Sequence, residues 1–390
     1  MNERYDFDQI IERRGTDSIK WAQFDGDVLP LWVADMDFVS PRPVIRALQK
    51  RVEHGVFGYA CEPADLRIAI RDRLLRLYQW QVEEEEFMFF PGVVTALNMV
   101  CRALGNAGDE VLIQPPIYPP FLSIPANARL CGTLAPLVMT SSGFEIDFEG
   151  LEQAITPRTR LFLFCNPHNP TGRIFTKTEL ERLAEICIRH DLVILSDEIH
   201  ADFVFPGHRH VPIASLGNEV AERTVTFFAP SKTYNIPGLH CSVAHSSSRK
   251  LRDRLKSSGA GLLDLPVNLL GYVAALAAYQ EGGIWLEQLL RYLEANRDLV
   301  TRSVLERFPG IAMFEPEGTY LAWLDCRQAG IGSDPAKFFL KEARVALSSG
   351  GSFGAQGEGF VRLNFGCPRP FLSQALERMG TALARVNRSD

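Results

Sequence analysis

A single lysine stands in an otherwise uncharged stretch near the middle of the chain. Lys232 is the only charged residue between Thr224 and Leu239, and it follows a strand-like apolar run that ends at Pro230-Ser231. Such surroundings weaken the hold of a lysine amine on its proton, and that amine is the group that forms a Schiff base with a carbonyl or aldehyde. We therefore predict that Lys232 is a catalytic residue.

Two other apolar runs end on polar residues of complementary chemistry. The run Leu192–Ser196 ends at Asp197, and the run Leu161–Cys165 is followed by a polar turn that contains Asn169. In open α/β sheets, ligands bind beyond the carboxyl ends of the strands. Three strand ends therefore deliver an amide, an acid and the amine of Lys232 to one edge of a sheet.

These residue types match the needs of a phosphorylated aldehyde cofactor with a ring nitrogen. Asp197 can keep a ring nitrogen protonated, because a nearby opposite charge favours the protonated form. The helix that starts at Val93 and Val94 offers free amide N–H groups to a phosphate. Tyr118 is restrained among prolines and can stack on a ring, and Asn169 can donate to a ring hydroxyl.

The elements that must position these residues alternate between short apolar strands and helices. We predict strands at Phe87–Phe90, Glu110–Gln114, Leu161–Cys165, Leu192–Ser196 and Thr224–Phe228, and helices at Val93–Leu104, Lys177–His190 and Leu265–Gln280. Such alternation is typical of an α/β fold with a mainly parallel sheet covered by helices.

A smaller α+β domain is expected after Gly282-Gly283. It would comprise helices at Ile284–Phe308, Pro335–Ala343 and Leu372–Val386 and strands at Ile311–Phe314, Thr319–Leu324 and Phe360–Asn364. We predict an N-terminal arm at residues 1–42 that packs with the small domain, a large cofactor-binding domain at 43–283, and the small domain at 284–390.

Composition excludes several classes of function. The net charge of −6 over 390 residues leaves no polycation for nucleic acid or anionic lipid, and no uncharged run reaches membrane-spanning length. The eight cysteines are scattered without a C-x-x-C pair, and the N-terminus lacks the apolar core of a signal peptide. We expect a cytoplasmic protein with reduced thiols, no nucleic-acid partner and no membrane partner.

His208 and His210 lack an acid or thiol at ligand spacing, so no metal is expected.

Four landmarks occur in the order found in one known family. They are Asn169-Pro170-Thr171-Gly172, Asp197-Glu198, Ser231-Lys232 and Arg362-Leu363-Asn364-Phe365. With them the chain resembles the class I/II aminotransferase-related family of fold type I, which uses pyridoxal 5′-phosphate. Further motifs resemble its branch of cystathionine β-lyases and related carbon–sulfur lyases, namely Arg14–Ser18 with Lys20-Trp21, Leu31–Phe38, Ser196–His200 and Thr319–Asp325.

This resemblance implies a role for each matching residue. Lys232 would carry the Schiff base and serve as general base and acid, and Arg362 would grip the substrate carboxylate, with Asn169 and Ala34 as further substrate contacts. Tyr59 would reach the phosphate of a neighbouring subunit, which implies a homodimer with sites at the interface. The implied cofactor-binding residues are Tyr59, Val93, Val94, Tyr118, Asn169, Asp197, His200, Ser231, Lys232 and His240.

Two positions depart from the family pattern, and several residues have a structural alternative. Ala229 stands where a small hydroxyl or glycine is usual, and His240 stands where a basic residue often binds phosphate. Asp197 alone could cap a helix, Tyr118 could pack in a proline-rich turn, and His200 could be a core histidine. The acids Asp35 and Asp37 could cap a turn.

The activity implied by the branch is β-elimination of a thiol from cystathionine or S-substituted cysteines, giving pyruvate and ammonia. Aminotransfer is the alternative within the family. It shares the early steps with β-elimination and differs in the atom to which the α-proton of the substrate returns. A third hypothesis, from another class, is a regulatory protein that keeps the fold and acts by docking a partner. No helix-turn-helix or basic region accompanies the fold, so direct DNA binding is disfavoured.

Overall fold

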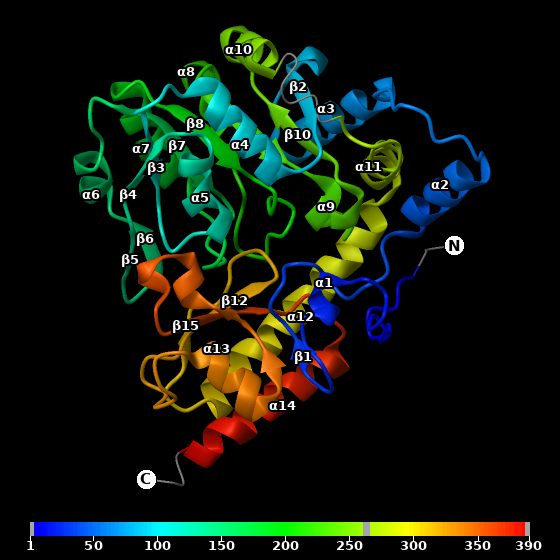
Figure 1. Ribbon diagram of the computed structural model, residues 1–390, viewed down its shortest axis with the longest axis vertical. Helices are drawn as coiled ribbons and strands as arrows, with labels where there is room; N and C mark the ends of the chain where they lie inside the picture. The colour runs from blue at the N-terminus through cyan, green and yellow to red at the C-terminus, as the bar shows by residue number, and fades with distance from the viewer. Residues whose placement is uncertain (1–3, 260–265, 387–390) are drawn as a thin grey trace.

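The computed structural model describes residues 4–259 and 266–386 (Figure 1). Its largest sheet has seven strands in the order β2-β10-β9-β8-β7-β3-β4. These are β2 (Phe87–Phe90), β10 (Ser242–His245), β9 (Thr224–Phe228), β8 (Val193–Asp197), β7 (Thr159–Cys165), β3 (Glu110–Ile113) and β4 (Cys131–Leu134). β10 runs antiparallel to both neighbours, and the other pairs are parallel. The predicted mainly parallel α/β fold is confirmed.

Both faces of this sheet are covered by helices, because its strands are nearly continuous apolar runs with hydrophobic side chains on both faces. In β7, Leu161 and Leu163 pack with helices on one face, while Phe162 and Phe164 pack with α7 on the other. The covering helices are α4 (Val93–Leu104), α5 (Pro119–Asn127) and α10 (Arg249–Gly259) on the first face, and α6 (Phe148–Gln153) and α7 (Lys177–Arg189) on the second. The sheet therefore holds its strand ends rigidly.

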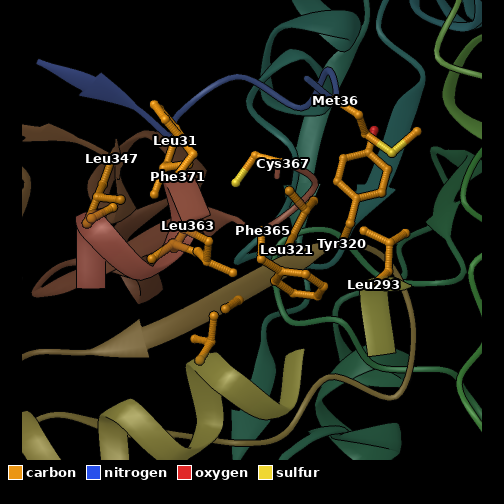
Figure 2. Packing of buried hydrophobic residues seen from close by; sticks show 14 of the residues in the cluster. Leu31, Met36, Leu293, Tyr320, Leu321, Leu347, Leu363, Phe365, Cys367 and Phe371 are labelled. Atoms are coloured by element: carbon orange, nitrogen blue, oxygen red, sulfur yellow. The ribbon is translucent and has the colours of Figure 1, made fainter. Parts of the chain in front are cut away.

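A four-stranded antiparallel sheet, lower in Figure 1, has the order β11-β12-β15-β14. Its strands are β11 (Ala312–Met313), β12 (Leu321–Asp325), β15 (Phe360–Asn364) and β14 (Ser348–Ser349), and its main helices are α12 (Gly283–Arg307) and α14 (Arg369–Val386). Leu321, Leu363 and Phe365 pack into one apolar core with Leu293 of α12 and Phe371 of α14 (Figure 2). The division of the chain at residues 42 and 283 stays a prediction.

Several element boundaries differ from the prediction for local reasons. The helix expected from Leu265 is α11 (Leu269–Glu281), because the Asn268 side chain accepts from the amide of Gly271 at 2.8 Å and caps the helix there; residue 265 lies outside the described part. β12 begins at Leu321 because Thr319 has φ +68°. The expected helix Pro335–Ala343 is α13 (Pro335–Phe338) followed by one π turn. The strands β4, β5 (Leu137–Met139) and β6 (Phe144–Ile146) were not predicted.

The N-terminal arm lies against the smaller sheet. β1 (Leu29–Pro30) pairs in parallel with β13 (Val345–Ala346), and Phe7 packs edge-on against Trp285 of α12. The arm includes α1 (Ile19–Ala22), and α2 (Arg42–Glu53) and α3 (Ala64–Tyr78) follow it. The remaining short helices are α8 (Asn218–Ala221) and α9 (Pro230–Thr233). No helix in the described residues has the length and apolar content needed to cross a bilayer.

A buried ion cluster holds the arm in place. The Lys20 ammonium, with no exposed surface, donates to Asp37 Oδ2 at 2.6 Å and to the carbonyl of Asp35 at 3.1 Å. Arg13 pairs with both acids. Burial opposes the charge on Lys20, but Asp37 and Asp35 outweigh it and raise the lysine pKa. The turn-capping role considered for Asp35 and Asp37 is wrong, because their oxygens accept from these cations.

Replacing Lys20 by Met should lower the free energy of unfolding by about 1.5 to 3 kcal/mol, because the buried Asp37 loses its hydrogen bond from the Lys20 ammonium and keeps only Arg13 and Trp21 as partners. The urea midpoint of the full chain measures this. Lys177→Met is the matched control, since Lys177 forms an exposed pair with Glu181 and its loss should cost less than about 1 kcal/mol. Equal effects of the two substitutions would contradict the prediction.

Candidate active site

One open cavity of about 1050 Å³ lies at the edge of the seven-stranded sheet where β8 ends. Asp197 is the last residue of β8, Asn169 follows β7 and Lys232 lies just after β9. Strands β7, β8 and β9 are adjacent and parallel, so their carboxyl ends bring these residues to one place. The predicted site residues that line the cavity are Ala34, Val93, Val94, Tyr118, Asn169, Asp197, His200, Ser231, Lys232, His240 and Arg362.

Lys232 lies in α9, a short helix that Pro230 opens. Its Nζ donates to the carbonyl oxygen of Ala34 at 2.7 Å. Burial of the amine lowers its pKa to about 8; Asp35 opposes this shift and Arg362 adds to it. An appreciable fraction of the amine is therefore neutral near pH 8, as a nucleophile or a general base requires.

Asp197 is a buried acid that forms no ion pair in the part of the chain described. Its Oδ1 accepts from the amide of Ile199 at 3.0 Å. Burial raises the pKa of this carboxyl to about 7, and the neighbouring Glu198 adds to the rise. A cationic group of a ligand would reverse that shift, so the environment of Asp197 fits a protonated ring nitrogen.

Arg362 is likewise buried without a carboxylate partner among the described residues. Its Nη1 donates to Asn169 Oδ1 at 2.9 Å and its Nη2 to the carbonyl of Trp32 at 2.8 Å, while the buried Nε has no partner. Burial lowers its pKa to about 10. The guanidinium lies 5.0 Å from the centre of the Phe353 ring. Its charge is thus available to an anionic ligand.

His200 and Tyr118 supply rings to the cavity. Burial, with the charges of Lys232 and Arg362, lowers the pKa of His200 to about 3, so this imidazole is neutral, and its buried Nδ1 has no partner. The core-histidine alternative leaves that nitrogen unsatisfied, whereas a ligand hydroxyl would satisfy it. Tyr118 precedes the Pro-rich start of α5 and remains partly accessible at the cavity wall.

The start of α4 lies in the cavity lining. Gly92 occupies the N-cap without a side-chain cap, so the first amides, including those of Val93 and Val94, lack helical partners. Ser231 also lines the cavity, and His240 Nδ1 contacts the Pro91 carbonyl at 3.2 Å. With the buried Asp197 and the Lys232 amine of lowered pKa, the cavity fits a phosphorylated aldehyde cofactor with a ring nitrogen.

Tyr59 is the one predicted site residue that lies outside the cavity. It is fully exposed in the segment between α2 and α3, where Val56 and Phe57 are also exposed. Its role toward a second subunit stays a prediction.

Sequence reasoning missed the residues that hold the cavity wall at positions 33–38. Asn364 Nδ2 donates to the carbonyls of Val33 and Asp35 at 2.6 and 2.7 Å, and Asn235 bonds the main chain of Met36 and Phe38. Asn235 has φ +54°. The contacts of Asn235 and Asn364 span about 200 and about 330 positions of the sequence, and no feature of a single residue reveals contacts over such separations.

His208 and His210 do not form a metal pair. His210 is buried and its Nε2 contacts Glu198 Oε2 at 2.7 Å, whereas His208 is partly exposed. No group of three or more metal-ligating side chains lies together in the described residues. His210 therefore contacts the acid that follows Asp197 in the chain.

The chain matches the model of one enzyme family, Aminotransferase class I and II, over residues 27–379. The chain belongs to this family, as predicted. It is 39% identical over 389 residues to "Cystathionine beta-lyase PatB" of Bacillus subtilis (strain 168), covering 97% of this chain and 100% of that protein.

Solved structures agree with this assignment. The structure of OvoB is similar with a TM-score of 0.93 and 42% identity, covering 97% of this chain and 99% of that one. Cystalysin from Treponema denticola, whose structure contains a pyridoxal 5′-phosphate cofactor, has a TM-score of 0.94 and 32% identity, covering 98% and 100% of the two chains. The predicted fold type I architecture is thereby confirmed.

Replacing Asp197 by Asn should stabilise the protein without ligands at pH 8 by on the order of 2 kcal/mol. The folded-state pKa of Asp197 is raised to about 7, so its ionisation costs stability above pH 7, and this cost disappears as the pH falls towards 4. Urea midpoints at pH 8 and pH 4.5 measure the difference. Asp253→Asn, at an exposed acid, is the control; a loss of stability in the Asp197 variant at pH 8 would contradict the prediction.

Proposed function

We propose that this chain is a pyridoxal 5′-phosphate-dependent carbon–sulfur β-lyase of the cystathionine β-lyase type. The observation that carries the proposal is one cavity in which a lysine of lowered pKa, a buried acid and a buried arginine meet without ion-pairing to one another. The relatives named cystathionine beta-lyase match over nearly the full length of the chain.

Pyridoxal 5′-phosphate, when bound, supplies an aldehyde carbon that condenses with amino groups and a ring that accepts electrons from the α-carbon of the substrate. Lys232 would hold the aldehyde carbon, and Asp197 would hold the ring nitrogen as a cation. His200 and Asn169 would face the ring hydroxyl, and Tyr118 would stack on the ring. The amides of Val93 and Val94, with Ser231 and His240, would hold the phosphate.

Lys232 handles the proton. The amino group of the substrate would displace Lys232 from the aldehyde carbon. The freed amine, whose pKa is about 8, would be partly neutral near physiological pH and could take the α-proton of the substrate. The resulting ammonium donates to the carbonyl of Ala34, which lies 2.7 Å from Nζ. The thiolate then leaves the β-carbon with the electrons of the C–S bond. Hydrolysis of the 2-aminoacrylate product gives pyruvate and ammonia, so cystathionine and water yield homocysteine, pyruvate and ammonia.

Arg362 orients the substrate. A guanidinium can bind a carboxylate through two parallel hydrogen bonds, which sets both position and rotation. Asn169 Oδ1 accepts from Arg362 Nη1 at 2.9 Å and helps to fix the orientation of the guanidinium, and Ala34, which also lines the cavity, would be a further substrate contact. Fixing the carboxylate in this way decides which bond at the α-carbon faces Lys232.

The purified enzyme should form pyruvate from L-cystathionine in the absence of any 2-oxo acid. Lys232→Ala should reduce the rate by about a thousandfold, because it removes the general base. Arg362→Lys should raise KM by about tenfold and change kcat less, because a lysine cannot bind the carboxylate in the bidentate mode. A coupled assay for pyruvate measures all three proteins. Strict dependence of turnover on 2-oxoglutarate would instead establish an aminotransferase.

We further propose a cytoplasmic homodimer in which Tyr59 reaches the phosphate end of the partner's cavity. Its support is the exposed segment that carries Val56, Phe57 and Tyr59. All eight cysteines are free thiols, and six of them are buried, which suits a reducing compartment.

A subunit-mixing experiment tests this arrangement. In the proposed dimer, each site takes Lys232 from one subunit and Tyr59 from the other. A mixed dimer of a Tyr59→Ala chain and a Lys232→Ala chain would therefore have one site with both residues intact and one site with both replaced. An equal mixture, dissociated and reassociated, should regain about a quarter of wild-type activity. Sedimentation equilibrium provides the dimer mass. A mixture no more active than the mean of its parents would contradict the shared site.

A further inference from the structure

Lys232 shares its hydrogen-bond acceptor with a tyrosine. The hydroxyl of Tyr320 donates to the carbonyl oxygen of Ala34 at 2.9 Å, and Lys232 Nζ donates to the same oxygen at 2.7 Å. Tyr320 has no exposed surface and precedes β12, and in Figure 2 its ring extends toward the segment that carries Met36. A carbonyl oxygen has two lone pairs, so both donors can bind at once.

The Ala34 carbonyl is held in place by contacts other than these two donors. Asn364 binds the carbonyls on either side of it, those of Val33 and Asp35, and Lys20 binds Asp35 as well. Asn235 bonds both main-chain groups of Met36. Loss of the Tyr320 hydroxyl would therefore leave the acceptor where it is.

We propose that Tyr320 is a positioning residue for Lys232, whose hydroxyl competes for the Ala34 carbonyl and so limits how strongly that carbonyl holds the lysine in its ammonium form. A second donor withdraws electron density from a shared oxygen, which makes that oxygen a weaker acceptor for the first. Tyr320 thus keeps the lysine closer to neutrality and ready to accept a proton. The effect acts through the acceptor, without contact between the hydroxyl and the reacting atoms.

The other groups around Lys232 set the background for this effect. Asp35 from the arm segment and Asp197 at the end of β8 favour the ammonium, while Arg362 on β15 disfavours it. His200 faces the lysine as a neutral ring and lies 5.7 Å from the Tyr320 ring, centre to centre. Burial raises the pKa of Tyr320 far above its ordinary value, so its hydroxyl remains a donor throughout the range in which the lysine titrates.

Tyr320→Phe tests the proposal with little risk to folding, because it removes the buried hydroxyl together with its hydrogen bond to Ala34 and leaves the Ala34 oxygen bound to Lys232. The ascending limb of the kcat–pH profile of the holoenzyme should move up by about half a pH unit, with the plateau kcat and KM nearly unchanged. At neutral pH this corresponds to about threefold slower turnover. Tyr292→Phe is the control, because it removes a hydroxyl that lies outside the cavity lining, where it donates to Asp8 and accepts from the amide of Arg369.

The kcat–pH measurement rests on the proposed function, because it needs turnover. A second measurement tests the role of Tyr320 without turnover. The pH dependence of acetylation of Lys232 in the cofactor-free protein, followed by competitive labelling and mass spectrometry, reports the lysine pKa directly. We expect the same upward shift in the Tyr320 variant and none in the Tyr292 variant, whatever reaction the enzyme catalyses. An unshifted labelling curve would overturn the proposal, and so would an equal loss of kcat at every pH.

Discussion

The fold takes three ionisable side chains out of water without pairing them to one another. Lys232, Asp197 and Arg362 each sit in one cavity, and burial is the largest cause of the pKa shift of each. Burying a charge without a partner is costly, so the cost must be met by rigid packing elsewhere. A ligand that carries a cationic ring nitrogen and anionic groups would supply the missing partners. Affinity for such a ligand is therefore built into the free protein.

Rigid packing comes from two layers that differ in kind. Behind the cavity, the strands β7, β8 and β9 are buried on both faces and fix Asn169, Asp197 and the start of α9. In front of it, the segment 33–38 has no regular structure, and side-chain amides of Asn364 and Asn235 bond its main chain instead. We call Asn364 and Asn235, which bond this segment, the clamp. The apolar sheet and the clamp together place Lys232 between the end of a strand and the carbonyl of Ala34.

The sequence predicted the sheet and the residues at its edge because those depend on local patterns. Apolar runs that end at Asp197 or before Lys232 show where strands stop, and parallel strands bring their ends together. The clamp could not be predicted in this way. Asn364 belongs to the landmark Arg362-Leu363-Asn364-Phe365, but that motif does not reveal that its side chain contacts a segment about 330 positions away. Asp35 and Asp37 were visible as acids in an apolar run, yet their partners Lys20 and Arg13 emerge only from the packing of the arm.

The pairing of β1 with β13 has a consequence for how the enzyme is made. Residues 29–30 leave the ribosome early, but their partner strand at residues 345–346 is synthesised near the end of translation. The clamp residue Asn364 comes later still. The front wall of the catalytic cavity must therefore wait for the last part of the chain, while the sheet behind it can already assemble. A nascent or truncated chain has the lysine but lacks the surroundings that make it reactive.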